Sequence, residues 1–208
     1  MPPISGTPLT AADRQLVLAT ARALGAPAAF DAPAFAPLLD AMRVADYPAG
    51  SQPLRAGDAP PMECFVLSGI VRSWVGDAAG RAVTLDFAMG PCALAPSIVR
   101  SADGCSRVHC EVLRPARLAW FDAGLLVQQM VDDPAIQRWG DAVLRAELMR
   151  RADREWALAV LPARERLRQL RAQRPQLEQL VPHHHIASYL GISPVSLSRL
   201  RAGEPPAA

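Results

Sequence analysis

The residues best suited to chemistry lie near the end of the chain, between His185 and Arg201. Their spacing would place Ser196, Ser198 and Arg199 on the outer face of a short helix. An arginine guanidinium can bridge O6 and N7 of a guanine, and a serine hydroxyl can bond to a phosphate or a base edge. The stretch could therefore read DNA, although the same pattern also fits a helical hairpin that only closes a core.

The elements that would position these side chains are two short helices joined by a tight turn. Gly191 can end the first helix, because glycine adopts the left-handed conformation without a Cβ penalty. Ser193 can cap the second helix, and Pro194 falls at its first position, where proline is tolerated best. The residues that would face the core of this pair are Ile186, Tyr189, Leu190, Leu197 and Leu200. Two helices in this arrangement are typical of a helix-turn-helix.

The basic residues are distributed unevenly along the chain of 208 residues. All 22 of them are arginine, and the chain has no lysine. Residues 1–137 hold 10 arginines and 13 acidic residues, a net charge of −3, whereas residues 138–208 hold 12 arginines and 7 acidic residues, a net charge of +5. A genome that prefers arginine explains the missing lysine but not this asymmetry. The basic C-terminal third therefore favours a polyanionic partner.

Composition and motifs exclude several classes of protein. Hydrophobic residues make up 50% of the chain, which is enough for a sizeable core. No apolar run approaches the roughly 18 residues of a membrane span. Residues 1–10 lack the basic and apolar regions of a secretory signal, so we expect a cytoplasmic protein. The chain has no Ser-His-Asp order, phosphate loop, HExxH or paired-carboxylate motif, so we do not expect an enzyme.

Short apolar runs alternate with turn residues over residues 42–121, which predicts an antiparallel barrel or sandwich of the jelly-roll kind. The expected strands are 42–47, 52–55, 64–67, 70–75, 83–89, 108–113 and 118–121. Ser68 and Gly69 are expected to form the turn between the third and the fourth of these strands. A rolled barrel of this size can enclose a pocket for a small effector.

Apolar residues recur every three or four positions from Ile136 to Val160, which predicts one helix of about 27 residues. Such a helix needs an apolar partner along its length. It could pack against the barrel, or it could pair with a second copy of the chain. We favour a coiled coil through residues 139–156, and hence a homodimer through residues 134–160. Pro162 then separates this helix from a basic helix over residues 163–174.

A barrel, a long helix and a terminal helix-turn-helix together resemble the Crp/Fnr superfamily of bacterial transcription regulators. The residues that resemble its cyclic-nucleotide-binding-type β-roll are Gly50, Gly57-Asp58, 64–72, Gly80-Arg81 and 87–90. The residues that resemble the helix-turn-helix of a short-tailed branch are Val181-Pro182, 186–193 and 197–199. The resemblance implies an α+β chain with four parts. These are an N-terminal helical extension (1–32), a β-roll sensor domain (33–133), a dimerisation helix (134–161) and a helix-turn-helix DNA-binding domain (162–208).

The resemblance also implies a homodimeric DNA-binding regulator in which Arg199 reads a base, with RNA polymerase as a further partner. The predicted DNA-binding residues are Ser193, Val195, Ser196, Ser198, Arg199 and Arg201. Longer members of the family carry a glutamate where this chain has Val195. Valine can contact a thymine methyl but cannot accept a hydrogen bond from cytosine. Too few residues follow Arg201 for a β-hairpin wing, so we expect weaker and more salt-sensitive binding.

The family's cyclic-nucleotide pocket uses a Gly-Glu pair at the start of a short helix and an Arg-Ser pair on the next strand. This chain has no carboxylate in residues 93–98, and its Ser106-Arg107 pair has the reverse order. A shift of one residue along a strand moves a side chain to the opposite face, so Arg107 would point out of the pocket. We therefore predict that cyclic AMP is not the effector. Ser97, Ser106 and Arg107 are candidates for binding another anion, and a pocket without any ligand is the other option.

No cofactor is predicted, although His109 and Cys110 lie in an expected strand and could serve haem. The chain's cysteines are Cys64, Cys92, Cys105 and Cys110. Their spacing matches no zinc motif, so we expect no metal site and mostly buried free thiols, with redox sensing left open. The three histidines at 183–185 cannot converge on one ion, because successive helical residues point about 100° apart. They could instead approach phosphates.

An alternative function belongs to a different class. The β-roll could be a sensor or adaptor whose helical C-terminus binds a protein partner. Replacing Arg199 by alanine would discriminate between the two functions, because the change should abolish DNA binding only in a regulator.

Overall fold

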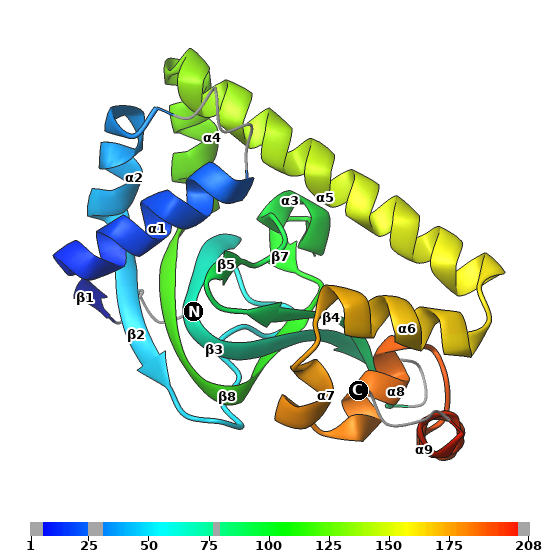
Figure 1. The fold of residues 1–208 in the computed structure, drawn as a ribbon. Coiled ribbons are helices and arrows are strands. Elements are labelled where there is room, and N and C mark those ends of the chain that lie inside the picture. Colours follow the sequence, from blue (N-terminus) through cyan, green and yellow to red (C-terminus); the bar gives the residue numbers. More distant parts are fainter. Residues whose placement is uncertain (1–5, 25–30, 77–79, 204–208) are drawn as a thin grey trace. The chain divides into compact units, whose positions relative to one another are not determined.

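The computed structural model describes residues 6–24, 31–76 and 80–203 (Figure 1). Contacts divide the chain into two compact units. Unit 1 comprises residues 1–73 and 87–149, and unit 2 comprises residues 74–86 and 150–208. Unit 2 therefore contains segments of two strands from the middle of the chain together with the C-terminal helices.

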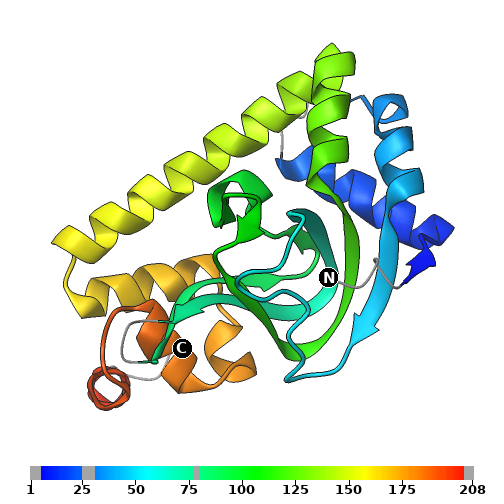
Figure 2. The same ribbon diagram turned by 180° about the vertical axis from the view of Figure 1, so that it is seen from behind.

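A six-stranded sheet is the main β structure, and its strand order is β1-β2-β8-β3-β4 with β5 beside β3. The strands are β1 (Thr7–Pro8), β2 (Arg43–Tyr47), β3 (Met62–Gly76), β4 (Ala82–Met89), β5 (Cys92–Ala93) and β8 (His109–Asp122). Strands β2 and β8 pair antiparallel over the whole of β2, as Figure 2 shows from behind. A second, two-stranded sheet joins β6 (Ser101–Ala102) to β7 (Cys105–Ser106). The antiparallel β architecture predicted from the sequence is confirmed.

Strands β3 and β8 are longer than the sequence pattern predicts, and β8 joins the predicted strands 108–113 and 118–121 into one. The predicted strands 64–67 and 70–75 are one continuous strand, β3, so the turn expected at Ser68 and Gly69 is wrong. Gly69 has φ of +88°, and a Cβ there would lie 2.3 Å from the carbonyl oxygen of Pro115. The glycine is thus required by a close approach of β8 and not by a turn. The predicted strand 52–55 is reduced to an isolated bridge between Leu54 and Cys110.

Short helices complete the core of unit 1. They are α1 (Ala11–Leu24), the 3₁₀ helix η2 (Pro33–Phe35), α2 (Ala36–Ala41), α3 (Ser97–Arg100) and α4 (Ala123–Asp132). Apolar residues of α1, η2 and α2 pack with the sheet in one buried cluster that includes Val17, Phe35, Leu38, Phe65 and Phe121. Helices α1, η2 and α2 thus bury apolar side chains against the sheet, which is the arrangement that their spacing of apolar residues dictates.

The N-terminus of α1 is held by a reciprocal cap. The amide of Thr10 donates to Asp13 at 3.0 Å, and the amide of Asp13 donates to the hydroxyl of Thr10 at 3.2 Å. Arg117 on β8 donates two hydrogen bonds of 3.0 Å to the same carboxylate. These bonds, chiefly those from Arg117, lower the pKa of Asp13 from 3.8 to about 2. The carboxylate therefore fixes both the start of α1 and its position on the sheet.

The long helix α5 runs from Pro134 to Val160, which confirms the predicted helix of 27 residues. Its first part belongs to the core of unit 1, because the indole of Trp139 donates to the carbonyl of Ala21 at 2.8 Å and meets Phe35 edge-on at 4.8 Å. A coiled coil that includes Trp139 is therefore wrong, since this side chain is already buried in its own chain. None of the described helices is long and apolar enough to cross a membrane.

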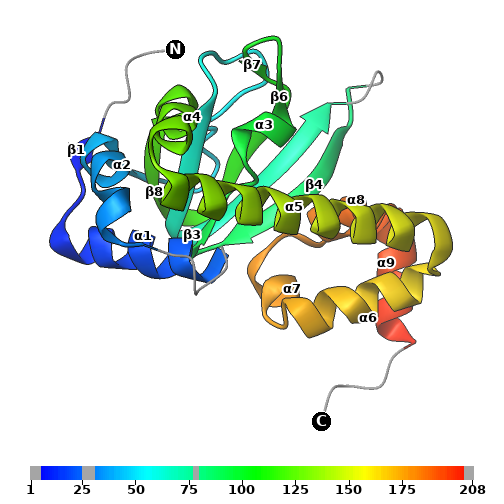
Figure 3. The ribbon, with the colours of Figure 1, turned by 90° about the horizontal axis from the view of Figure 1, so that it is seen from above.

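The described helices that follow α5 lie together in unit 2 (Figure 3). They are α6 (Ala163–Gln173), α7 (Leu177–Leu180), α8 (His183–Tyr189) and α9 (Pro194–Ala202). The residues that they bury together include Leu167, Leu170, Leu177, Ile186 and Leu197. The basic helix predicted over residues 163–174 is confirmed as α6, and the two motif helices predicted from the sequence are α8 and α9.

Candidate nucleic-acid interface and effector pocket

The turn between α8 and α9 is closed by backbone hydrogen bonds. The amide of Ile192 donates to the carbonyl of Ala187 at 3.0 Å, and the amide of Gly191 donates to that of Ser188 at 3.1 Å. This pair of bonds is a Schellman motif, which needs a left-handed residue, and Gly191 has φ of +67°. The glycine thus fixes the angle at which α9 leaves α8.

The start of α9 is capped as its sequence predicts. Ser193 has extended backbone angles, its hydroxyl accepts from the amide of Ser196 at 3.0 Å, and Pro194 occupies the first turn. The two serine hydroxyls also lie 2.9 Å apart, so each is in part committed to the other. Leu197 is buried, whereas the side chains on the opposite face are exposed, namely Val195, Ser196, Ser198 and Arg199. One face of α9 therefore anchors the helix and the other is open to a partner.

The two arginines of α9 differ in their surroundings. Arg199 is exposed, and within the described part of the chain its guanidinium has no hydrogen-bond or ion-pair partner. Arg201, in contrast, lies 3.2 Å from a carboxylate oxygen of Glu178 and donates to Nδ1 of His183 at 2.9 Å. Among the residues predicted to bind DNA, Arg199 and Ser198 are thus free to reach a ligand, whereas Arg201 links α9 to α7 and α8.

The three histidines at the start of α8 differ in their surroundings. Because arginine only donates, Nδ1 of His183 must accept from Arg201, and its Nε2 then donates to the carbonyl of Glu178 at 3.1 Å. The ring of His184 lies 3.9 Å from that of His185, which is buried. His183 is thus committed to Arg201 and Glu178, while the rings of His184 and His185 lie against each other.

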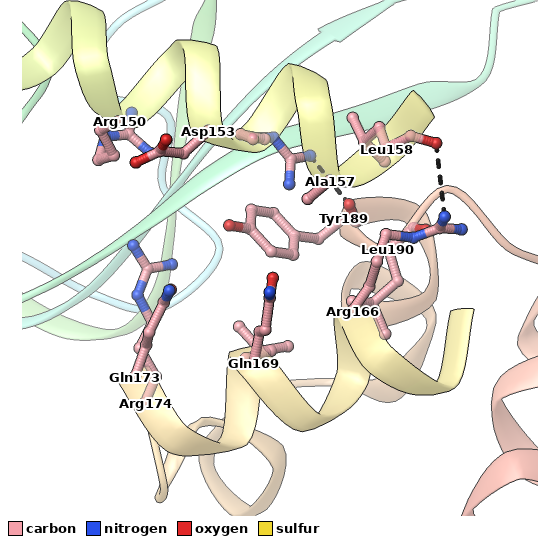
Figure 4. A pocket seen from close by; sticks show the side chains of 12 residues that line it. Arg150, Asp153, Ala157, Leu158, Arg166, Gln169, Gln173, Arg174, Tyr189 and Leu190 are labelled. Atoms are coloured by element: carbon pink, nitrogen blue, oxygen red, sulfur yellow. Dashed lines mark hydrogen bonds between the residues drawn. The ribbon is translucent and has the colours of Figure 1, made fainter. Parts of the chain in front are cut away.

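Two arginines that the sequence pattern did not single out hold the helix-turn-helix in place, and Figure 4 labels one of them, Arg166. Arg154 on α5 lies 3.7 Å over the ring of Tyr189 and donates to the carbonyl of that residue at 2.9 Å. Arg166 on α6 donates to the carbonyls of Leu190 at 3.0 Å and of Leu161 at 2.6 Å. Both guanidiniums thus satisfy carbonyls at the ends of helices α5 and α8. Burial lowers the pKa of Arg154.

The edge of β4 makes a second set of bonds to these helices within unit 2. The hydroxyl of Ser188 accepts from the amide of Thr84 at 2.9 Å and donates to the carbonyl of Ala82 at 3.2 Å. Arg174 of α6 donates to Asp86 at 2.8 Å. A strand edge therefore positions α8 and α6, the helices that support α9. No sequence motif signals this, because the partners lie about a hundred residues apart in the chain.

The short helix α3 does not have a free N-terminus. The amide of Ser97 donates to both carboxylate oxygens of Glu63, at 2.9 and 3.1 Å, and its hydroxyl donates to the same carboxylate at 2.6 Å. Arg100 lies 3.8 Å from that carboxylate and also donates to the carbonyl of Met62. Burial raises the pKa of Glu63, while the bonds from Ser97 and the charge of Arg100 oppose the shift. A carboxylate of the chain itself thus occupies the place proposed for an anionic ligand.

The three residues predicted to bind an effector anion are not brought together. The hydroxyl of Ser106 is buried and donates to the carbonyl of Val108 at 2.9 Å. Arg107 is exposed, and its amide donates to the carbonyl of Arg100 at 2.8 Å. Only Ser97 lines a cavity of about 530 Å³ in unit 1, whose walls are mostly apolar. Sequence reasoning missed Glu63, since nothing in the pattern of β3 shows that its carboxylate faces α3.

The residues considered for haem, metal or redox chemistry are dispersed. Nδ1 of His109 accepts from the amide of Ala56 at 3.3 Å, while Cys110 is fully buried on the other side of the strand. All four cysteines are free thiols, and burial raises the pKa of both Cys64 and Cys110. Across the described residues, no three His, Cys, Asp or Glu side chains are grouped so that they could hold a metal ion.

Comparison with solved structures identifies the fold. The structure is similar to FixK2 from Bradyrhizobium japonicum, with a TM-score of 0.65 and 17% identity over 77% of this chain and 83% of that chain. It is similar to the c-di-GMP responsive global regulator CLP from Xanthomonas campestris, with a TM-score of 0.64 and 18% identity over 83% and 90% of the two chains. A CooA mutant from Carboxydothermus hydrogenoformans gives a TM-score of 0.62 and 19% identity over 80% and 78%.

These similarities show the fold of the chain: a cyclic-nucleotide-binding-type β-roll followed by a helical C-terminal domain. The α+β fold implied by the resemblance in sequence is confirmed. No protein-family model and no curated protein matches the chain. At 17–19% identity the likeness extends to the fold, and the functional residues have to be argued from this chain's own geometry.

Proposed function

We propose that the protein is a DNA-binding transcription regulator whose helix α9 enters the major groove. One observation carries the proposal: α9 lies in a helix-turn-helix and presents outward Ser198 and Arg199, whose guanidinium has no partner among the described residues. A guanidinium without an internal partner is free to make a bidentate contact with guanine. Arg199 would read a base, while Ser196, Ser198 and Val195 would contact phosphates or base edges. Ser193 and Arg201 would position α9.

The proposed regulator acts as a homodimer through the second half of α5. This part of the helix exposes four large apolar side chains: Leu148 (52%), Met149 (59%), Trp156 (55%) and Val160 (60%). Met149, Trp156 and Val160 follow one another at intervals of seven and four residues, which places them along one side of the helix. Exposed apolar side chains at this spacing favour a parallel helix pair. Two copies would place two α9 helices on half-sites about one helical turn apart. We expect Trp156→Glu to produce monomers in sedimentation velocity, whereas Trp156→Phe should remain dimeric.

The effector of the proposed regulator is not cyclic AMP. A cyclic phosphate needs free amide donors and a cation in the pocket, but Glu63 already takes the amide of Ser97, and Arg107 is exposed. A phosphate charge beside the Glu63 carboxylate would be repelled. Isothermal titration with cyclic AMP should therefore show no binding in the micromolar range.

Selection of bound duplexes from a random pool tests the proposal. The wild-type protein should enrich a sequence with two-fold symmetry, and Arg199→Ala should lose that enrichment. Arg14→Ala is the matched control, because Arg14 is a partly exposed arginine that pairs with Asp40 in unit 1. A wild-type protein that enriches nothing, yet captures a protein partner through residues 194–201, would instead support a sensor or adaptor.

A further inference from the structure

The cavity of about 530 Å³ in unit 1 has the size of a small-molecule site. It lies between α3, α4, the first half of α5 and the sheet. Its wall includes Phe65, Leu94, Phe121, Leu126, Met130 and Val143. None of the residues predicted from the family pattern to hold the effector, apart from Ser97, takes part in this wall.

The polar groups of the cavity select against a charged ligand. Glu63 and Ser97 are the buried polar residues that line it, and they bond to each other. Among the described residues that line the cavity there is no arginine, so an anionic group would meet the carboxylate of Glu63 and no cation of the wall itself. A cation would find only the carboxylate of Glu63, which already accepts bonds from Ser97 and lies near Arg100. A neutral ligand avoids both the repulsion that an anion would meet and the loss of hydration that a poorly paired cation would suffer.

The exposed part of the lining is mostly apolar as well, with Gln137 as its polar member. Ile98 on α3 and Val127 and Val131 on α4 belong to its lining, and they are 70%, 60% and 76% exposed. Three large apolar side chains exposed at one opening are unfavourable in water and would be covered by an apolar ligand. The opening and the wall of the cavity thus both favour an apolar ligand.

We propose that this cavity binds an uncharged, largely apolar small molecule with at most one hydrogen-bonding group. As a regulatory site the cavity depends on the proposed function, because its wall includes Trp139, Gly140 and Val143 of α5. The same helix continues to Val160, directly before Pro162 and α6. A ligand that fills the gap between α4, α5 and the sheet would therefore act on the helix that leads to the DNA-binding residues.

The test uses the neutral dye N-phenyl-1-naphthylamine, whose fluorescence rises on transfer to an apolar site. We expect saturable binding to the full chain, and displacement by decan-1-ol but not by decanoate at about pH 8, where the acid is ionised. The two competitors share one alkyl chain and differ in charge. Equal displacement by both would overturn the charge selection, and absence of saturable dye binding would overturn the site.

Substitutions locate the bound dye. Val143→Phe fills the cavity and should weaken dye binding by about tenfold or more. Asp141→Phe is the matched control. Asp141 is exposed and lies two residues before Val143, a rotation of roughly 200° about the helix axis, so its side chain leaves the helix on the opposite side. Glu63→Gln should allow decanoate to displace the dye. Unchanged binding by Val143→Phe would place the dye elsewhere and refute the proposal.

Two further outcomes distinguish a small-molecule site from a contact between copies of the chain and from the DNA-binding function. Dye binding that disappears as the protein self-associates in sedimentation would mean that a second copy covers the cavity, and the small-molecule site would be wrong. Because dye binding is measured without DNA, its failure leaves the DNA-binding proposal untouched. Failure of DNA selection, in turn, leaves the dye result intact.

Discussion

Replacing Asp13 by asparagine should destabilise the protein measurably at neutral pH. The carboxylate accepts two hydrogen bonds of 3.0 Å from Arg117 and is bonded to Thr10 at the start of α1. The side chain of Asp13 is largely buried, so solvent screens these bonds little. Asparagine retains one oxygen acceptor for the cap but loses the charge that holds Arg117.

The size of the effect follows from the pKa of Asp13. Its lowering from 3.8 to about 2 corresponds to about 2 kcal/mol, at 1.36 kcal/mol for each pKa unit. Because the folded-state pKa lies below the unfolded one, this stabilisation is fully present above about pH 4 and is lost as the pH falls through about 2. The two proteins should therefore differ at pH 7 and converge in acid.

Urea unfolding followed by circular dichroism at several pH values measures this difference. Asp40→Asn is the control. The side chain of Asp40 is 69% exposed, so its ion pair with Arg14 should contribute about 0.5 kcal/mol or less to the free energy of unfolding. A loss for Asp13→Asn no larger than that of the control, or one that does not shrink in acid, would refute the role assigned to the carboxylate.

Two further predictions concern the turn of the helix-turn-helix and the cysteines. Gly191→Ala should lower the free energy of unfolding by about 1 kcal/mol, because φ is +67° there, and denaturant unfolding would contradict this if the two proteins matched. A thiol reagent should modify Cys92 and Cys105 first in the folded protein, because Cys64 and Cys110 are buried with raised pKa values. Mass spectrometry of partly modified protein that found Cys64 or Cys110 labelled first would contradict the burial.

Features that depend on local sequence were predicted well. The apolar spacing from Ile136 to Val160 defined α5 almost to the residue, because helical periodicity is a property of neighbouring residues. The glycine turn and the serine cap of α9 were equally accessible, since Gly191 and Ser193 act on their own backbone. The resemblance in motif order then predicted the fold class.

Features that depend on distant partners could not be predicted. Gly69 suggests a turn by its type, but the close approach of Pro115 from β8 decides its role. The sequence predicts an N-terminus of α3 that is open to an anion, but the fold brings the carboxylate of Glu63 to it from 34 residues away. The missed arginines, Arg154 and Arg166, likewise acquire their roles from carbonyls that only the folded chain presents.

The most direct test of the account is the affinity of the protein for its selected duplex, measured by fluorescence anisotropy at fixed salt. The account predicts that Arg199→Ala binds that duplex about 5 to 150 times more weakly, the equivalent of about 1–3 kcal/mol for one bidentate base contact. Its affinity for unrelated duplexes should change far less, and Arg14→Ala should bind both as the wild type does. An Arg199→Ala protein that keeps the full preference for the selected duplex would contradict the central claim.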